Sequence, residues 1–104
     1  MVSIELSAPL QFLILHELRT PKNGQELAEK IGQRKGTGML TPGTIYPVLK
    51  ELHKKRFVRY RSSGRQKTYV LSPKGEEELT QLYAQFSQLF KGMRHKIQPA
   101  RGYT

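Results

Sequence analysis

The chain contains no cysteine and no tryptophan, and each of its eight acidic residues is a glutamate. Without cysteine it can form neither a disulfide framework nor a thiolate metal site. Its three histidines, His16, His53 and His95, do not stand at a metal-ligand spacing. Ser62 and Ser63 have no aspartate with which to complete a catalytic triad. The sequence therefore predicts a protein that is not an enzyme and that holds no metal or other cofactor.

Long apolar runs are also missing. No stretch approaches the roughly 20 consecutive apolar residues that a membrane-spanning helix requires. The first residues are not basic, and the apolar run from Leu10 to Leu15 is interrupted by Gln11, so the pattern of a signal peptide is absent. The 104 residues suit a single domain, small enough for a partner subunit to help bury its surface. We expect a cytoplasmic protein with no membrane partner.

Positive charge is abundant and lies mainly in one segment. The chain carries a net charge of +10 and has a pI of about 10.2. Residues 50–74 contribute +8 of this charge, from nine basic side chains and one acid, Glu51. Charge this concentrated is typical of a surface that meets a polyanion, and the segment lacks the broad apolar face needed for membrane insertion. Nucleic acid is the expected partner, and a merely solvated basic face is the alternative.

Residues 41–55 have the pattern of a helix that suits a DNA groove. Thr41 is a suitable N-cap, because its hydroxyl can accept a bond from a first-turn amide, and Pro42 suits the first helical position. Pro47 removes one helical hydrogen bond and predicts a kink near the start. Small polar side chains come first and lysines later, which suits a major groove wide enough to admit a helix. The apolar stripe, at i, i+3, i+4 and i+7, comprises Ile45, Val48, Leu49 and Leu52.

Residues 56–71 have the pattern of a two-stranded hairpin that turns at Ser62–Arg65. Gly64 can supply the positive φ that such a turn needs. Because strand side chains alternate between faces, Arg59 and Arg61 share one face of the first strand. The hairpin thus adds basic side chains beside the charged helix.

The run Thr-Pro-Gly-Thr-Ile-Tyr-Pro-Val-Leu-Lys-Glu-Leu at 41–52 resembles the signature of the PadR-like family of winged-helix transcription regulators. Residues 64–75 resemble that family's wing and the start of its last helix, and the likeness extends over about residues 6–92. The chain departs from the family pattern at Gln25, where an aromatic residue is usual, and at Arg56, where glycine is usual. The resemblance implies an α+β, mostly helical fold: a winged helix-turn-helix with a two-stranded wing and a long C-terminal dimerisation helix.

Two further helices precede the groove helix. Residues 4–19 carry apolar side chains on more than one side, so we expect this helix to pack both within its own domain and against a partner. A turn at Thr20–Gly24 leads into a helix of about residues 23–33, which the resemblance makes the positioning helix of the helix-turn-helix. The glycine-rich segment 32–38 lacks the Gly-Lys-Ser/Thr ending of a P-loop, so no nucleotide site is predicted there.

The last helix is expected to begin at Ser72, a suitable N-cap, with glutamates in its first turns. Apolar residues recur at helical spacing as far as Ile97, farther than a compact winged helix can cover, so a second copy of the chain is expected to bury them. We assign residues 1–75 to the winged-helix DNA-binding domain, 76–97 to a dimerisation helix of the same compact unit, and 98–104 to a flexible tail. The predicted dimer interface comprises Leu10, Leu13, Leu79, Leu82, Tyr83, Phe86, Leu89, Phe90 and Met93.

Together, pattern and resemblance predict a homodimeric regulator that binds specific sequences of double-stranded DNA and represses transcription. Thr44 would approach base edges, whereas Thr41 and the first amides of its helix would hold phosphate. Tyr46 is predicted to be either a phosphate ligand or a core residue. Two alternatives remain open: a sequence-neutral architectural DNA-binding protein, and a protein-interaction module whose basic face meets an acidic partner. The predicted DNA-binding residues are Thr41, Thr44, Tyr46, Lys50, Lys54, Arg59, Arg61, Arg65 and Lys67.

Some family members respond to small phenolic or drug-like ligands at the dimer interface. Tyr83, Phe86 and Phe90 could line such a pocket in this chain. Aromatic residues at helical spacing are more often core, however, so a small-molecule effector stays unsupported by the sequence.

Overall fold

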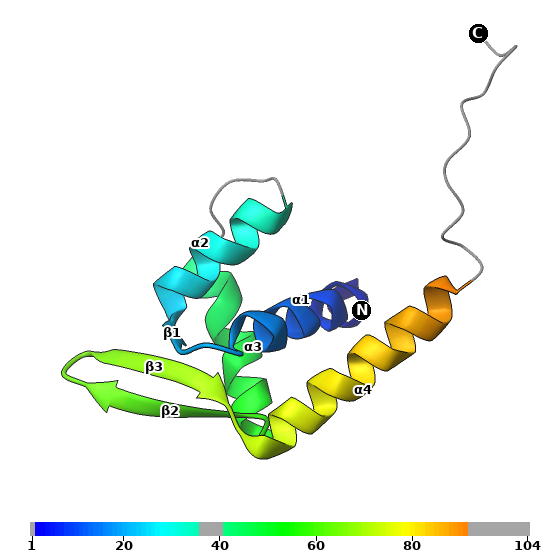
Figure 1. Cartoon of the computed structure of the whole chain (residues 1–104). Coiled ribbons are helices and arrows are strands. Elements are labelled where there is room, and N and C mark those ends of the chain that lie inside the picture. Colours follow the sequence, from blue (N-terminus) through cyan, green and yellow to red (C-terminus); the bar gives the residue numbers. More distant parts are fainter. Residues whose placement is uncertain (1, 36–40, 92–104) are drawn as a thin grey trace, which may run out of the picture.

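The structure, a computed structural model, describes residues 2–35 and 41–91. Three helices form a central group, a β-hairpin projects from one side of it, and a fourth helix leads away on the other side (Figure 1). The elements in chain order are α1 (Val2–Glu17), β1 (Lys22–Asn23), α2 (Gly24–Lys35), α3 (Pro42–Lys54), β2 (Val58–Ser63), β3 (Gln66–Leu71) and α4 (Pro73–Phe90).

One apolar core joins the helices to the sheet. Each helix contributes side chains three or four residues apart, because that spacing places them on one helical face. In α3 the predicted stripe is confirmed: Ile45, Leu49 and Leu52 are buried, and Val48 is half-buried. The large side chains with less than 2% of their surface exposed are Ile14, Leu15, Leu18, Leu27, Ile31, Ile45, Leu49, Leu52 and Val58.

The sheet has three strands in the order β1-β3-β2, all antiparallel, where the sequence predicted two. The missed strand, β1, was predicted to be a turn. It is only two residues long and pairs Lys22 with Tyr69 and Asn23 with Thr68. A strand of two residues is too short to show an alternation of apolar and polar side chains, so the neighbouring Pro21 and Gly24 made the segment look like a turn. The strand pairs the segment after α1 with the wing.

The wing turns within two residues, Gly64 and Arg65, and Gly64 has a φ of 64°. Ser62 and Ser63, predicted to belong to the turn, are instead the last residues of β2. The register is fixed by this tight turn, so Ser63 lies opposite Gln66 and Tyr60 lies opposite Tyr69.

Helix α3 begins at the predicted residue but without the predicted cap bond. The Thr41 hydroxyl accepts no first-turn amide. The Thr44 amide instead donates to the Thr41 carbonyl oxygen at 3.0 Å, and the two threonine hydroxyl oxygens lie 3.2 Å apart. The helix continues through Pro47 to Lys54.

Helix α3 ends in a Schellman motif with arginine where glycine is usual. Arg56 has a φ of 65°, the left-handed region that glycine occupies at least cost. Its amide donates to the His53 carbonyl oxygen at 2.9 Å, and the Phe57 amide donates to the Leu52 carbonyl oxygen at 3.0 Å. Arg56 therefore closes α3 in the strained left-handed conformation.

Helix α4 starts against the end of α3. The Gly75 amide donates to the Ser72 hydroxyl at 3.0 Å, which confirms Ser72 as the cap, and that hydroxyl donates to the Arg56 carbonyl oxygen at 2.6 Å. A Cβ atom built on Gly75 would lie 1.9 Å from the Phe57 carbonyl oxygen. The junction therefore requires glycine. The predicted continuation of the apolar stripe to Met93 and Ile97, and the predicted tail 98–104, lie outside the described residues.

Candidate nucleic-acid interface

The outward side of α3 carries the predicted groove residues. Burial of Ile45, Leu49 and Leu52 against the core turns the other side of the helix to solvent, because a helix repeats every 3.6 residues. The predicted residues on this helix are all exposed, and they are Thr41, Thr44, Tyr46, Lys50 and Lys54. The first turn presents two hydroxyl groups in contact, and the later turns present amines.

Tyr46 leans across to the start of α2. Its hydroxyl lies so close to Gly24 that a Cβ atom there would be 2.5 Å from the oxygen, yet 47% of the Tyr46 surface remains exposed. Tyr46 is therefore not a core residue. Gly24 leaves room for the phenol of Tyr46 at the start of α2, so this partly exposed side chain lies between the two helices of the helix-turn-helix.

The wing has two chemically different faces. Because Tyr60 lies opposite Tyr69 in the register, these two residues share the inner face with Lys67, whereas Arg59 and Arg61 lie on the outer face. The sequence predicted that Arg59 and Arg61 share a face, but it did not place Lys67 relative to them. The structure divides the wing cations, since alternation across a paired register separates Lys67 from both arginines.

A groove runs between α3 and the inner face of the wing. Its volume is about 350 Å³, and three tilted aromatic rings line it in sequence: the His53 and Tyr60 centroids are 5.0 Å apart, and those of Tyr60 and Tyr69 are 5.6 Å apart. The Lys67 amine lies 4.5 Å from the Tyr60 ring centroid, a cation–π contact. The lining residues are Tyr46, Leu49, Lys50, His53, Tyr60, Lys67 and Tyr69.

A second groove continues toward the wing tip. It shares Tyr46, Lys67 and Tyr69 with the first and adds Arg65 and Gln66 from the wing. Sequence reasoning missed His53, Tyr60 and Gln66 as surface residues of this region. The signal that could have found Tyr60 is its parity with Lys67, which a two-residue turn at Gly64 and Arg65 would have fixed.

The basic residues of this surface carry no ion pair within the described part of the chain. The salt bridges there all involve Glu17, which pairs with Arg34 and, at 3.6 Å, with Lys22. Burial raises the pKa of the Glu17 carboxyl, but the Arg34 hydrogen bond and the charges of Arg34 and Lys22 outweigh it, so the net pKa is lowered. Positive charge on α3 and the wing is therefore left for an external anion.

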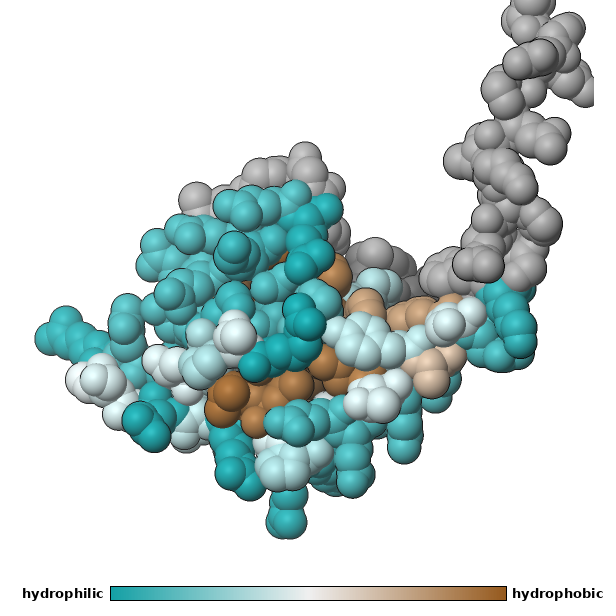
Figure 2. Space-filling view, viewed as in Figure 1, coloured by the Kyte–Doolittle hydropathy of each residue, from teal (hydrophilic) through white to brown (hydrophobic). Residues whose placement is uncertain are grey.

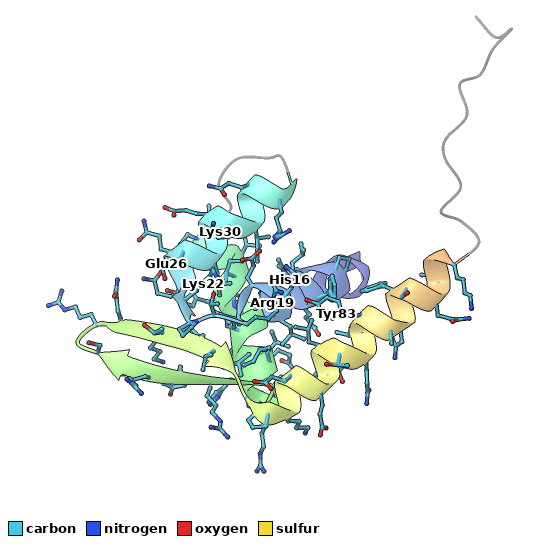
Figure 3. The ribbon with its side chains drawn as sticks, viewed as in Figure 1. His16, Arg19, Lys22, Glu26, Lys30 and Tyr83 are labelled. Atoms are coloured by element: carbon cyan, nitrogen blue, oxygen red, sulfur yellow. The ribbon has the colours of Figure 1, made fainter. Side chains whose placement is uncertain are left out.

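A polar network fixes α2 and α4 against α1 (Figure 3). Arginine can only donate, so the 3.1 Å contacts from Arg19 and Arg34 to His16 Nε2 make that nitrogen an acceptor. His16 Nδ1 then carries the proton and donates to the Tyr83 hydroxyl at 2.5 Å. Burial, with the charges of Arg19 and Arg34, lowers the pKa of His16, so the imidazole is held neutral.

The predicted dimer residues whose side chains the structure describes fall into three groups. Leu10 and Leu79 are buried in the core of their own chain, which leaves them little surface for a partner. Leu13, Leu82 and Phe86 are half-buried, whereas Tyr83 and Leu89 are 37% and 62% exposed. The Phe90 side chain and all of Met93 lie outside the described part of the structure.

Apolar side chains gather where α1 and α4 lie beside one another (Figure 2). The Phe12 ring meets Tyr83 and Phe86 edge to face, with centroids 5.6 and 4.7 Å apart. These contacts hold the third and fourth turns of α4 on the domain, and Leu89 lies farther along the same helix with most of its surface open.

Within 2–35 and 41–91, no three or more His, Cys, Asp or Glu side chains form a group that could hold a metal ion. In the same ranges no helix is both long and apolar enough to cross a bilayer.

Comparison with known proteins agrees with the architecture. A PadR-like transcription factor from Bacteroides fragilis superposes with a TM-score of 0.76 at 25% identity, over 89% of this chain and 94% of that one. PadR of Bacillus subtilis, solved in complex with operator DNA, gives a TM-score of 0.62 at 24% identity over 91% of this chain and 52% of that one. RosR of H. salinarum gives 0.70 at 22% identity, over 77% and 74%.

Among curated protein sequences, none matches the chain. The family model of the transcriptional regulator PadR-like family matches residues 13–81, more than half of the sequence. The predicted mostly helical α+β winged helix-turn-helix is confirmed by the solved structures, with a three-stranded sheet in place of the two-stranded one. The chain belongs to the PadR-like family of transcriptional regulators.

Proposed function

We propose that this protein binds specific sequences of double-stranded DNA as a cytoplasmic homodimer and represses transcription by occupying them. The observation that carries the proposal is the surface formed by α3 and the wing, where exposed hydroxyls and unpaired cations adjoin one groove. Nothing in this surface suggests catalysis, and we propose no enzymatic role. Bacillus subtilis PadR, a structural relative, was solved with operator DNA.

In this proposal the first turn of α3 reads bases and its surroundings bind phosphate. Thr44 contacts base edges in the major groove, and Thr41 contacts the adjoining phosphate. Tyr46, held against Gly24, donates a hydrogen bond from its hydroxyl to a DNA phosphate that lies near the start of α2. Lys50 and Lys54 contact the backbone or guanine, as cations on an exposed helix face can do.

The wing contributes in two ways, because its cations lie on two faces. Lys67 and Arg65 adjoin the grooves beside α3 and contact the nearer phosphates or the minor groove. Arg59 and Arg61 lie on the outer face of the wing and contact DNA phosphates farther from α3.

The homodimer is proposed from the apolar surface of α1 and α4. Leu89 is exposed over 62% of its surface and Tyr83 over 37%, and a second copy of the chain packed on this surface would bury both. A two-fold dimer would carry two α3 helices to half-sites about 34 Å apart on one face of the duplex. Leu89→Glu should therefore give monomers at micromolar concentration by analytical ultracentrifugation, and Gln88→Glu, its exposed neighbour, should stay dimeric.

Sequence preference is tested with duplexes selected from a random pool. Thr44→Ala should reduce the preference for the selected duplex over a scrambled one by about tenfold, one base contact's worth of discrimination. The double variant Arg65→Ala with Lys67→Ala should bind both duplexes more weakly, by the same factor. If neither duplex is preferred by the unmodified protein, the sequence-neutral architectural function replaces ours; if neither is bound, the basic face serves an acidic protein.

A further inference from the structure

A second basic surface lies at the other end of α3. The end of α3, the start of β2 and the first turn of α4 enclose an open hollow of about 690 Å³. Four of its lining side chains are cationic, namely Lys54, Arg56, Arg59 and Lys74, and none is acidic. His53 lines both this hollow and the groove between α3 and the wing, so the two surfaces are continuous around the end of α3.

The four cations are not neutralised by their own chain. Within the described residues none of them has an ion pair, and the contact of Lys74 is with the Phe57 ring, whose centroid lies 5.4 Å from the amine. Like charges gathered on one surface repel, and an anion bound among them removes that repulsion.

Arg56 is an independent sign that charge matters here. The residue sits at a φ of 65°, where glycine would close α3 with less strain. The chain places an exposed guanidinium at this position instead, on the rim of the hollow. Strained residues gather where a side chain has a role that offsets the strain.

The length of α3 indicates which anion lies there. Its 13 residues span about 20 Å, whereas the major groove is about 12 Å wide and 8.5 Å deep. With the first turns of α3 in the groove, its last turn emerges beside a backbone strand. We propose that the hollow binds DNA backbone phosphate flanking the half-site, as a contact additional to those of the first turns of α3 and the inner face of the wing. This inference rests on the proposed DNA-binding function.

The test is the salt dependence of duplex binding by two variants, Arg56→Gly and Lys74→Gln, with Lys91→Gln at the far end of α4 as the control for lost charge. Each lost phosphate contact lowers the slope of log K against log salt by about 0.9. Because each variant removes one contact from each protomer of the proposed dimer, the slope falls by about 1.8, and the affinity lost between 50 and 200 mM salt shrinks about 12-fold. Arg56→Gly should do this while raising the melting temperature, a pairing of effects that misfolding cannot produce. Lys91→Gln should keep the original slope.

Slopes unchanged in both Arg56→Gly and Lys74→Gln, with tight binding by the unmodified protein, would overturn the inference and leave the proposed function standing. Inorganic pyrophosphate separates a free-phosphate site from a DNA contact. If it raises the melting temperature of the unmodified protein but not of the variants, while their DNA slopes are unchanged, the hollow binds a free phosphate compound and not DNA. If no duplex binds the unmodified protein at all, the proposed function itself fails.

Discussion

Replacing Gly75 by alanine should show whether the junction of α3 and α4 depends on contact with backbone. The added methyl would lie 1.9 Å from the Phe57 carbonyl oxygen and 2.9 Å from its carbon, far inside ordinary contact distance. Phe57 cannot yield easily, because its amide closes α3 on Leu52 and its carbonyl oxygen accepts from the Ser72 amide at 3.0 Å. Helix α4 would have to move away from Phe57, which joins α3 to the wing.

The expected cost is about 3 kcal/mol, the upper end of what overpacking usually costs, and about 12–24 °C in melting temperature for a domain of this size. The sign of the change in the free energy of unfolding decides the test, because alanine that fits inside a helix is favoured over glycine by about 1 kcal/mol. Urea and thermal unfolding followed by circular dichroism would measure the change. A variant as stable as the parent, or more stable, would refute the close approach of α4 to Phe57.

Three further outcomes follow from the same geometry. Gly24→Ala should leave the free energy of unfolding within about 1 kcal/mol of the parent, because the clashing atom is the mobile end of Tyr46, yet weaken duplex binding in a fluorescence anisotropy titration; unchanged binding would contradict the role of Tyr46. Arg56→Gly should stabilise the fold by about 1 kcal/mol in urea, and a loss would contradict the left-handed conformation. Stability should fall as pH drops below about 6.5, because His16 has a lowered pKa and its unfolded form binds the proton first; His16→Gln should flatten the melting temperature between pH 7 and pH 5, and an unchanged profile would argue against it.

Much of the groove helix could be predicted from sequence because its determinants are local. Pro42 at the first position and the spacing of Ile45, Leu49 and Leu52 are properties of one short segment. Ser72 as the cap of α4 is equally local, since its hydroxyl bonds an amide only three residues away.

What escaped prediction depends on contacts between distant segments. β1 exists because Lys22 and Asn23 meet residues more than forty positions later, and no short pattern encodes that pairing. The position of Tyr46 depends on Gly24, on a different helix. The division of the wing cations depends on the register of β2 with β3 as well as on alternation within one strand.

The Thr41 cap failed for a different reason. Its residue type and position were right, but a competing bond from the Thr44 amide to the Thr41 carbonyl oxygen left the hydroxyl to pair with the Thr44 hydroxyl. Two nearly equal local bonds cannot be ranked from sequence.

The most direct measurement of the central claim is the affinity for a selected duplex as salt rises from 50 to 200 mM. A dimer that neutralises six or more phosphates should lose about a thousandfold in affinity over that range. A loss of less than tenfold would mean that the unpaired cations of α3 and the wing do not meet a DNA backbone.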